Sequence, residues 1–223
     1  MTALNMWQDG RTAFILNDTA IYGPTGILIA DQAKTISING LAFGQYAAVA
    51  CTGALTPEVF AMALNGRAIL TATDLITLLP EVLADIGACG RTHWPDHVVW
   101  PGAGMAVAIF DPLRPHPDLI MIADEAGGVL PGDYTPFMPI AVRYWTTGMV
   151  PAGPFTYKGK GTAIHFDPYR DGLAIMESQR ADVWPDGKAR IGGSVVLTTI
   201  GAAGVKSEIL HTWPDEIGQP IIL

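Results

Sequence analysis

The feature that most constrains the fold is a change of hydrophobic period near residue 56. Before it, apolar residues form short runs or alternate with polar ones, which is typical of β-strands. After it, apolar residues recur every three or four positions, which is typical of helices. The strands predicted before the change span residues 11–17, 34–39 and 46–52, with a turn at 23–26.

Two helices are predicted after this change. The segment Thr56–Glu58 combines an N-cap residue, a proline at the first helical position and an acidic residue, and predicts a short helix that ends near residue 66. A longer helix is predicted from about residue 73 to Gly87 or Gly90. Its apolar residues form one stripe along the helix: Leu75, Leu79, Val82, Leu83 and Ile86.

Strand-forming segments then return. Asp167-Pro168 caps a third predicted helix between them. Strands and helices that occur in separate blocks indicate the α+β class rather than a series of βαβ units. No shift of composition marks a linker, so we expect one domain over residues 1–223. The later predicted strands span residues 104–110, 119–123, 139–147, 193–200 and 205–211.

Charged residues are scarce in this chain. They make up 15% of the residues, whereas a soluble domain usually has about 25%. The net charge of −8 argues against a nucleic-acid partner. The longest uncharged run, Thr35–Pro57, contains Asn39 and Gln45 and alternates like strands, so we expect no transmembrane segment. The first residues lack the basic and apolar regions of a signal peptide.

The segment His93–His97 contains two histidines and an aspartate that could ligate a metal. Pro95 excludes the helical presentation of ligands found in HExxH sites, and no further ligand cluster is evident. A turn is therefore the favoured interpretation, and we expect neither a metal nor another cofactor. Cys51 and Cys89 form no CxxC motif, and we expect both to be buried core residues.

The start of the chain is the first candidate for catalysis. Removal of Met1 would expose Thr2 with a free α-amine, so that the hydroxyl attacks and the amine takes its proton. The ordinary pKa of an α-amine is about 7.7–8.0. The chemistry also needs an acceptor that orients the amine, a cation that lowers its pKa, and a backbone N–H for the oxyanion. Asp18, Lys34 and Gly53, at the ends of predicted strands, are candidates for these roles.

This arrangement resembles the N-terminal nucleophile (Ntn) hydrolases, in particular the proteasome β-type subunits. Sixteen residues separate Thr2 from Asp18, and sixteen more separate Asp18 from Lys34, as in that family. The segment Cys51–Ala54 is similar to the one that supplies the oxyanion N–H there, after a loop a few residues longer. The order of the later elements, with Gly192-Gly193 before a strand, extends the resemblance over nearly the whole chain.

The resemblance implies a four-layer αββα sandwich, in which two antiparallel sheets pack face to face and helices cover both outer faces. Strands such as 46–52 and 104–110 would then be apolar on both sides, which explains the scarcity of charge. It also implies the roles of the site residues. Thr2 is the nucleophile and base, Asp18 orients it, Lys34 tunes its pKa, and the Gly53 N–H stabilises the oxyanion.

Several positions depart from the family pattern. The family has an aspartate and a serine just before the Gly-Gly strand, where this chain has Lys188 and Ile191 unless Asp186 is shifted in. Another supporting serine of the family would correspond to Thr146 or Thr147. If Met1 is retained, the free amine of the mechanism does not form. Asp18 as the cap of a turn, with Lys34 as its ion-pair partner, is then the alternative interpretation.

Two functions therefore stay open. In the first, the protein is a threonine-type amide or peptide hydrolase. In the second, it is an inactive proteasome-like component of a larger particle, such as a phage virion, since similar proteins occur in phage and prophage gene clusters. In both cases we expect a cytoplasmic or virion-associated protein that self-associates into a ring or larger assembly. Part of its uncharged loop surface should be the interface, because interface cores are depleted in charge.

Overall fold

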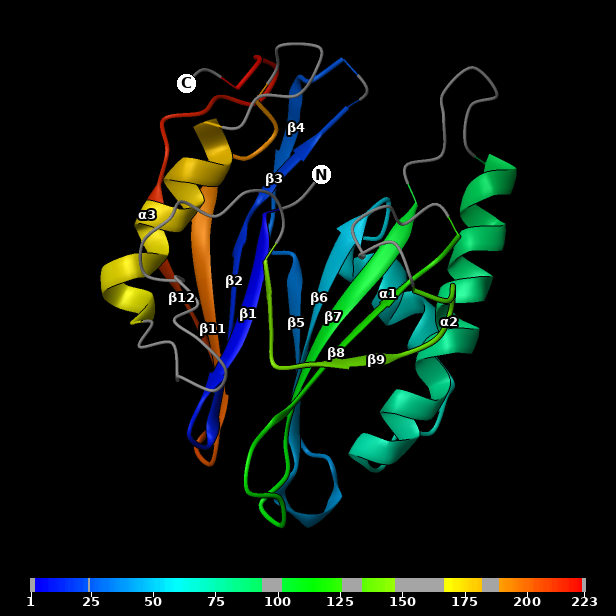
Figure 1. Cartoon of the computed structure of the whole chain (residues 1–223). Coiled ribbons are helices and arrows are strands. Elements are labelled where there is room, and N and C mark those ends of the chain that lie inside the picture. Colours follow the sequence, from blue (N-terminus) through cyan, green and yellow to red (C-terminus); the bar gives the residue numbers. More distant parts are fainter. Residues whose placement is uncertain are drawn as a thin grey trace.

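Two five-stranded antiparallel sheets pack against each other at the centre of the molecule (Figure 1). The computed structural model describes residues 3–23, 25–93, 102–125, 134–146, 167–181 and 189–221. The first sheet has the order β10-β1-β2-β11-β12, with β1 (Leu4–Asp9), β2 (Thr12–Asp18), β10 (Tyr144–Thr146), β11 (Ser194–Gly201) and β12 (Gly204–Thr212). The second has the order β5-β6-β7-β8-β9, with β5 (Thr35–Ile38), β6 (Tyr46–Gly53), β7 (Ala103–Phe110), β8 (Asp118–Ala123) and β9 (Ile140–Val142).

The core between the two sheets is built from unequal side chains. The first sheet contributes large residues from β1 and β2, whereas β6 and β7 contribute mainly alanines. Small residues on one sheet leave room for large ones on the other, so the layers interdigitate at close packing. The residue at every position of β7 is buried, as expected for a strand covered on both faces. The buried residues of this layer include Leu4, Met6, Ala13, Ile15, Ala48, Ala50, Ala106 and Ala108.

Two helices cover the outer face of the second sheet, α1 (Pro57–Leu64) and α2 (Ala72–His93) (Figure 1). The Thr56 hydroxyl accepts a hydrogen bond from the Val59 N–H at 3.5 Å, as predicted for the N-cap of α1. Thr71 and Asp74 cap α2 reciprocally through their side chains and backbone N–H groups. The predicted apolar stripe of α2 is buried. The helix continues through Gly87 and Gly90 to residue 93.

A single helix of 14 residues, α3 (Pro168–Ala181), packs on the outer face of the first sheet. A reciprocal pair of amide hydrogen bonds joins it to β1. Asn5 Nδ2 donates to Gln179 Oε1, and Gln179 Nε2 donates to Asn5 Oδ1, both at 2.9 Å. Both side chains are buried, so each satisfies the polar groups that the other would leave unpaired.

The expected four-layer αββα sandwich of two sheets, with helices over both outer faces, is wrong. The structure has a third sheet of two strands, β3 (Ala20–Tyr22) and β4 (Leu28–Asp31), which pair with each other. These short strands form a hairpin beyond the end of β2, around the turn predicted at residues 23–26. The helical cover is also unequal, since α3 is about 21 Å long at 1.5 Å per residue and packs mainly on β2, β11 and β12.

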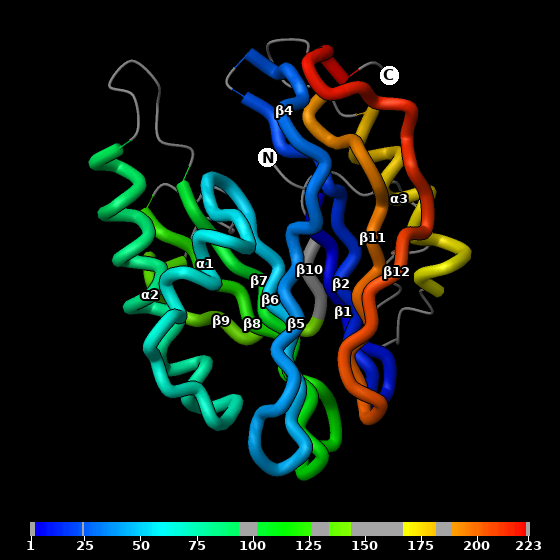
Figure 2. Tube along the Cα trace, turned by 180° about the vertical axis from the view of Figure 1, so that it is seen from behind, coloured from blue at the N-terminus to red at the C-terminus, as the bar shows by residue number. Residues whose placement is uncertain are grey.

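The topology brings four chain positions to one end of the molecule, the upper end in Figure 1. β1 begins there after Ala3, β2 ends there at Asp18, β5 begins there after Lys34, and β6 ends there at Gly53. Figure 2 shows from behind that β5 and β12, the edge strands of the two sheets, lie side by side. Among the described residues, no helix has both the length and the apolar character that a membrane span needs.

Candidate functional site

Asp18 is the centre of the predicted site, and its side chain is completely buried at the end of β2. Its Oδ1 accepts hydrogen bonds from Lys34 Nζ at 2.9 Å and from the Ala3 backbone N–H at 3.0 Å. Its Oδ2 accepts a longer bond from the Gly192 N–H at 3.4 Å. A buried carboxylate needs such donors, because burial without them is costly. Asp18 thus joins the start of β1, the start of β5 and the Gly192-Gly193 turn.

Lys34 is the buried cation of the site, with 6% of its surface exposed. Within the part of the chain that the structure describes, Asp18 is the only hydrogen-bond partner of its ammonium group. Burial raises the pKa of Asp18 and lowers the pKa of Lys34, and the attraction between the two charges offsets part of each shift. Asp31 is also near enough to raise the pKa of Lys34. Burial of the pair therefore has a desolvation cost, which the attraction between the two groups offsets in part.

Gly53 ends β6 in a left-handed conformation with φ +71°. A Cβ at this position would lie 2.2 Å from the Gly102 carbonyl oxygen, so only glycine fits there. The Cys51 N–H donates to the Lys34 carbonyl at 2.8 Å. Because N–H groups alternate along a strand, the Gly53 N–H points to the same edge of β6 as the Cys51 N–H. It therefore faces the side on which Lys34 lies.

Thr2 and Met1 lie outside the described residues. The structure therefore brings together Asp18 and Lys34, and it places Gly53 on the strand beside Lys34. The residue next to Thr2, Ala3, is completely buried and bound to Asp18 through its backbone.

Sequence reasoning missed one part of this region, the pair of Arg180 and Asp215 behind the Gly192-Gly193 turn. Arg180 Nη2 lies 2.6 Å from Asp215 Oδ1, and both side chains are almost fully buried. Asp215 ends the tripeptide Trp213-Pro214-Asp215. Nothing in that tripeptide indicates an arginine partner 35 residues earlier in the chain.

The positions that depart from the proteasome pattern are only partly described. Ile191 packs its side chain against the apolar cluster beneath α3, so this position offers no hydroxyl to the site. Thr146 pairs with Asn5 in the first sheet. Asp186, Lys188 and Thr147 lie outside the described residues.

The two cysteine predictions have different outcomes, and the segment considered as a metal site is described at one residue only. Of the segment His93–His97, only His93 is described, and its Nδ1 lies 2.8 Å from the Cys89 carbonyl oxygen. No group of three or more His, Cys, Asp or Glu side chains that could hold a metal is found among the described residues. Cys51 is buried, and burial raises the pKa of its thiol. Cys89 is exposed, so the expectation of a buried residue is wrong there, because the last turns of α2 extend past the sheet core.

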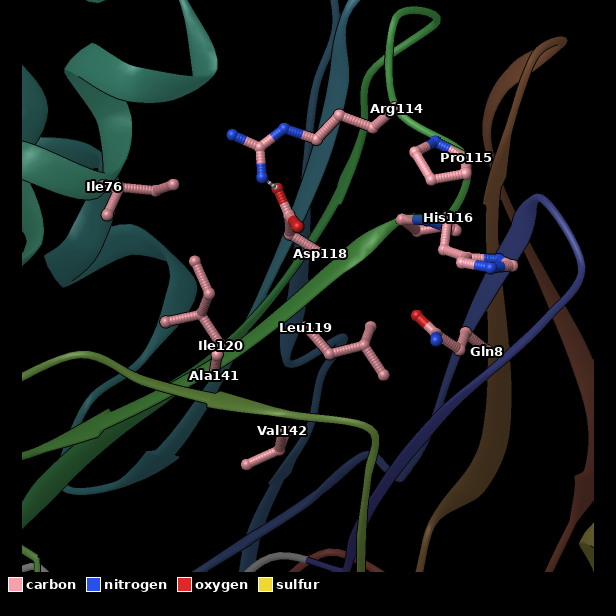
Figure 3. A pocket seen from close by; sticks show the side chains of 11 residues that line it. Gln8, Ile76, Arg114, Pro115, His116, Asp118, Leu119, Ile120, Ala141 and Val142 are labelled. Carbon is pink, nitrogen blue, oxygen red and sulfur yellow. Dashed lines mark ion pairs between the residues drawn. The ribbon is translucent and has the colours of Figure 1, made fainter. Parts of the chain in front are cut away.

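A pocket of about 490 Å³ lies away from these residues, between the loop 114–117, β8, β9 and α2 (Figure 3). Figure 3 shows the Arg114–Asp118 ion pair beside the apolar side chains of Leu119 and Ile120. A second, open pocket of about 390 Å³ is lined by Thr19 and Ala33, the chain neighbours of Asp18 and Lys34. The larger hollow therefore contains none of the four predicted site residues.

Comparison with solved structures identifies the fold. The Anbu (Gly-1) mutant from Hyphomicrobium sp. strain MC1 matches with a TM-score of 0.61 and 12% identity, over 96% of this chain and 89% of that one. Anbu from the same strain matches with a TM-score of 0.60 and 12% identity, over 97% and 89% of the two chains. Anbu (ancestral beta-subunit) from Yersinia bercovieri gives 0.59 and 10%, over 96% and 88%.

No protein-family profile matches the sequence, and no curated protein matches it. The fold is therefore of the proteasome-like, N-terminal nucleophile type, and the likeness at this identity extends to the fold alone. The predicted kinship with phage or prophage proteins needs correction. The similar structures named above are Anbu proteins from bacteria, and nothing supports a phage origin.

Proposed function

We propose that the protein is an N-terminal-threonine amide hydrolase in which removal of Met1 exposes Thr2. The four roles follow the chemistry of such sites. Thr2 supplies the hydroxyl nucleophile and the α-amine base, Asp18 orients Thr2, Lys34 lowers its pKa, and the Gly53 N–H binds the oxyanion. In this proposal, residues 1–223 form one domain. The observation that carries it is the buried Asp18–Lys34 pair, which binds the backbone of Ala3.

The hydrogen bond from the Ala3 N–H to Asp18 supports a position of Thr2 close to the Asp18–Lys34 pair. Thr2 is bonded to the Ala3 nitrogen, and that atom lies 3.0 Å from Asp18 Oδ1. The same oxygen lies 2.9 Å from Lys34 Nζ. A residue attached at this point can reach both charged groups, because a peptide unit spans about 3.8 Å between Cα atoms.

The environment of Lys34 supports its role. An ammonium group has three donors, and among the described residues only Asp18 accepts from that of Lys34. A buried cation beside the α-amine lowers the pKa of the amine, because like charges disfavour each other. More of the amine is then in its basic form at neutral pH.

A second candidate function is an inactive structural or assembly component of a larger particle. Ile191 favours it, because an apolar side chain stands where the proteasome pattern has a serine. Exposed apolar residues on two adjacent loops also favour self-association. Phe43 is 75% exposed and Leu113 is 85% exposed, and exposed apolar patches mark interaction sites. Both candidate functions include assembly into a ring.

The test combines intact mass with covalent labelling. The protein is produced without an N-terminal tag, and its mass shows whether Met1 is removed. An epoxyketone or β-lactone probe should then add once to the wild type and not at all to Thr2→Ala. Thr73→Ala, which changes an exposed threonine, is the matched control and should label like the wild type. If the protein retains Met1 and takes up no probe, the proposed hydrolase activity is rejected. The assembly component is then the remaining candidate function.

A further inference from the structure

The turn that contains Gly192 and Gly193 controls the second oxygen of Asp18. Lys34 and Ala3 both bind Oδ1, whereas the Gly192 N–H donates to Oδ2. At 3.4 Å this bond is long, so a small displacement of the turn breaks it. The position of the turn therefore decides whether Oδ2 has a donor.

The turn has no room for side chains. A Cβ on Gly192 would lie 2.4 Å from Asp215 Oδ2, and one on Gly193 would lie 2.5 Å from Thr19 Oγ1. Its backbone groups are bonded to other elements instead. The Gly192 carbonyl accepts from the Ala20 N–H at 3.1 Å, and the Gly193 carbonyl accepts from the Trp213 N–H at 2.8 Å.

Arg180 and Asp215 hold this turn from behind. The guanidinium binds both carboxylate oxygens, with Nη1–Oδ2 at 2.7 Å and Nη2–Oδ1 at 2.6 Å. Arg180 Nη1 also donates to the Ile191 carbonyl at 2.8 Å, and the Gly193 N–H donates to Asp215 Oδ2 at 2.9 Å. The guanidinium carbon lies 4.6 Å from the centre of the Trp213 ring. The pair therefore binds the turn through the Ile191 carbonyl on one side of Gly192 and the Gly193 N–H on the other.

We propose that Arg180 and Asp215 are positioning residues, which hold the Gly192 N–H against Asp18 and so keep Asp18 oriented toward Thr2. This inference rests on the proposed function. The pair touches no reacting atom and acts only through the turn. Lysine cannot replace the arginine, because it lacks the planar fork that binds the carboxylate and the Ile191 carbonyl together.

The consequence is a change in the ionisation of Asp18. A hydrogen bond to a carboxylate favours its charged form, so loss of the Gly192 donor raises the pKa of Asp18. The other groups that face Asp18 are Lys34 before β5, with Asp31 near it, the Ala3 N–H before β1, and the α-amine once Met1 is removed. None of these changes in variants of Arg180 or Asp215.

The experiment compares Arg180→Lys and Asp215→Asn with Arg170→Lys, an exposed arginine on the same helix that binds Asp171. Two quantities are measured in each folded protein. One is the rate of probe addition to Thr2. The other is the titration of the Asp18 carboxyl by ¹³C NMR of aspartate-labelled protein, assigned with Asp18→Asn. Asp215→Asn keeps the size of the side chain and the Arg180 guanidinium, so it changes the same contact from its other partner.

We expect Arg180→Lys and Asp215→Asn to slow labelling by about 10- to 100-fold, as misplacement of a positioned group by about 1 Å does. Both should raise the pKa of Asp18, and Arg170→Lys should change neither quantity. A wild type that is not labelled overturns the proposed function and this inference with it. Normal labelling of the wild type with an unchanged Asp18 titration in both variants overturns this inference alone, as does slower labelling without that change.

Discussion

The two ends of the packed sheets have ion pairs of the same kind in different environments. At the upper end in Figure 1, the ion pairs Asp18–Lys34 and Arg180–Asp215 are buried. At the lower end, the Arg114–Asp118 pair is open to solvent, with side chains 57% and 31% exposed. Among the large apolar residues, Phe43 and Leu113 are exposed at the lower end, and Ile29 and Ile217 are exposed near the upper end.

Glycines differ between the ends in the same way. A Cβ on Gly53, Gly192 or Gly193 would lie within 2.6 Å of another heavy atom. A Cβ on Gly10 or Gly40 would have no such atom within 4 Å. Gly10 and Gly40 therefore serve turn geometry, whereas Gly192 and Gly193 allow the backbone to approach the carboxylates of Asp215 and Asp31 closely. Buried charge and crowded backbone together are features of a preorganised site rather than of a surface loop.

The largest effect should come from removing the cation of the upper end. We expect Lys34→Met to slow probe addition to Thr2 by about 10³-fold or more, which is roughly 4 kcal/mol of barrier. The reason is that the amine loses the charge that lowers its pKa. Lys206→Met is the control, because Lys206 is 72% exposed and binds only the surface residue Glu208 among the described side chains. Equal labelling of the Lys34 variant and the control would reject a catalytic role for Lys34.

The next largest effect should come from removing one partner of an ion pair, which should lower the free energy of unfolding more at the upper end than at the lower end. Asp215→Ala leaves the Arg180 guanidinium buried without its carboxylate, and the expected loss is about 3–5 kcal/mol of the free energy of unfolding. Asp118→Ala at the lower end should lose less than about 1 kcal/mol, because solvent screens that pair. Chemical denaturation measures both. Similar losses would show that burial does not distinguish the two pairs.

The glycines offer a comparison at matched backbone geometry. Gly10 and Gly53 both have positive φ, at +56° and +71°. Gly10→Ala should lose about 1–2 kcal/mol from the left-handed conformation alone. Gly53→Ala should lose a further 1–3 kcal/mol or so, because its Cβ must displace backbone at residue 102. Equal unfolding free energies for the two variants would mean that the end of β6 moves freely.

The buried pair also predicts a pH dependence of stability. Burial already raises the folded-state pKa of Asp18 in the wild type. In Lys34→Met the carboxyl also loses the attraction that lowers its pKa, so the folded-state pKa lies further above the unfolded value. The folded protein then binds more protons than the unfolded one between these two pKa values. Its stability therefore rises as pH falls through this window, by up to about 1.4 kcal/mol per pH unit.

Wild-type protein and Lys34→Met are unfolded in denaturant at a series of pH values between 4 and 8, and Lys206→Met is the control. The control should follow the wild type. A Lys34→Met curve parallel to both would contradict the buried, paired state of Asp18.

Local signals in the sequence predicted much of the fold. The segment Thr56–Glu58 begins α1 as expected, because capping depends on neighbouring residues only. Asp18 and Lys34 were predicted from the resemblance to the Ntn hydrolases, whose spacing they match, and the structure joins them in an ion pair. Gly87 did not end α2, because a glycine costs a helix only about 1 kcal/mol and its missing Cβ leaves room for Arg91 and Asp124.

Long-range contacts set the limit of such reasoning. The β3–β4 hairpin was missed because strands of three and four residues are too short to show alternation. This hairpin is the third sheet that overturns the expected two-sheet sandwich. The bond between Arg180 and Asp215 joins α3 to a segment after β12, and no periodic pattern links residues so far apart. How much of the first sheet is covered depends on the length of α3. The capping signal at Asp167-Pro168 predicts where this helix begins but not how long it is.

The smallest effect is predicted at Phe43, where the lower end holds an aromatic residue in a left-handed conformation with φ 60°. That conformation costs a residue with a side chain about 1–2 kcal/mol, and glycine costs about 0.5–1 kcal/mol in chain entropy. Phe43→Gly should therefore stabilise the monomer by about 0.5 kcal/mol. Leu113→Gly is the control, since Leu113 is also largely exposed but has no positive φ, and the variant should gain no stability. If the loops form an interface, sedimentation velocity should show weaker self-association of Phe43→Gly despite its greater stability. Unchanged association would place the interface elsewhere and leave the exposed Phe43 a strained surface residue.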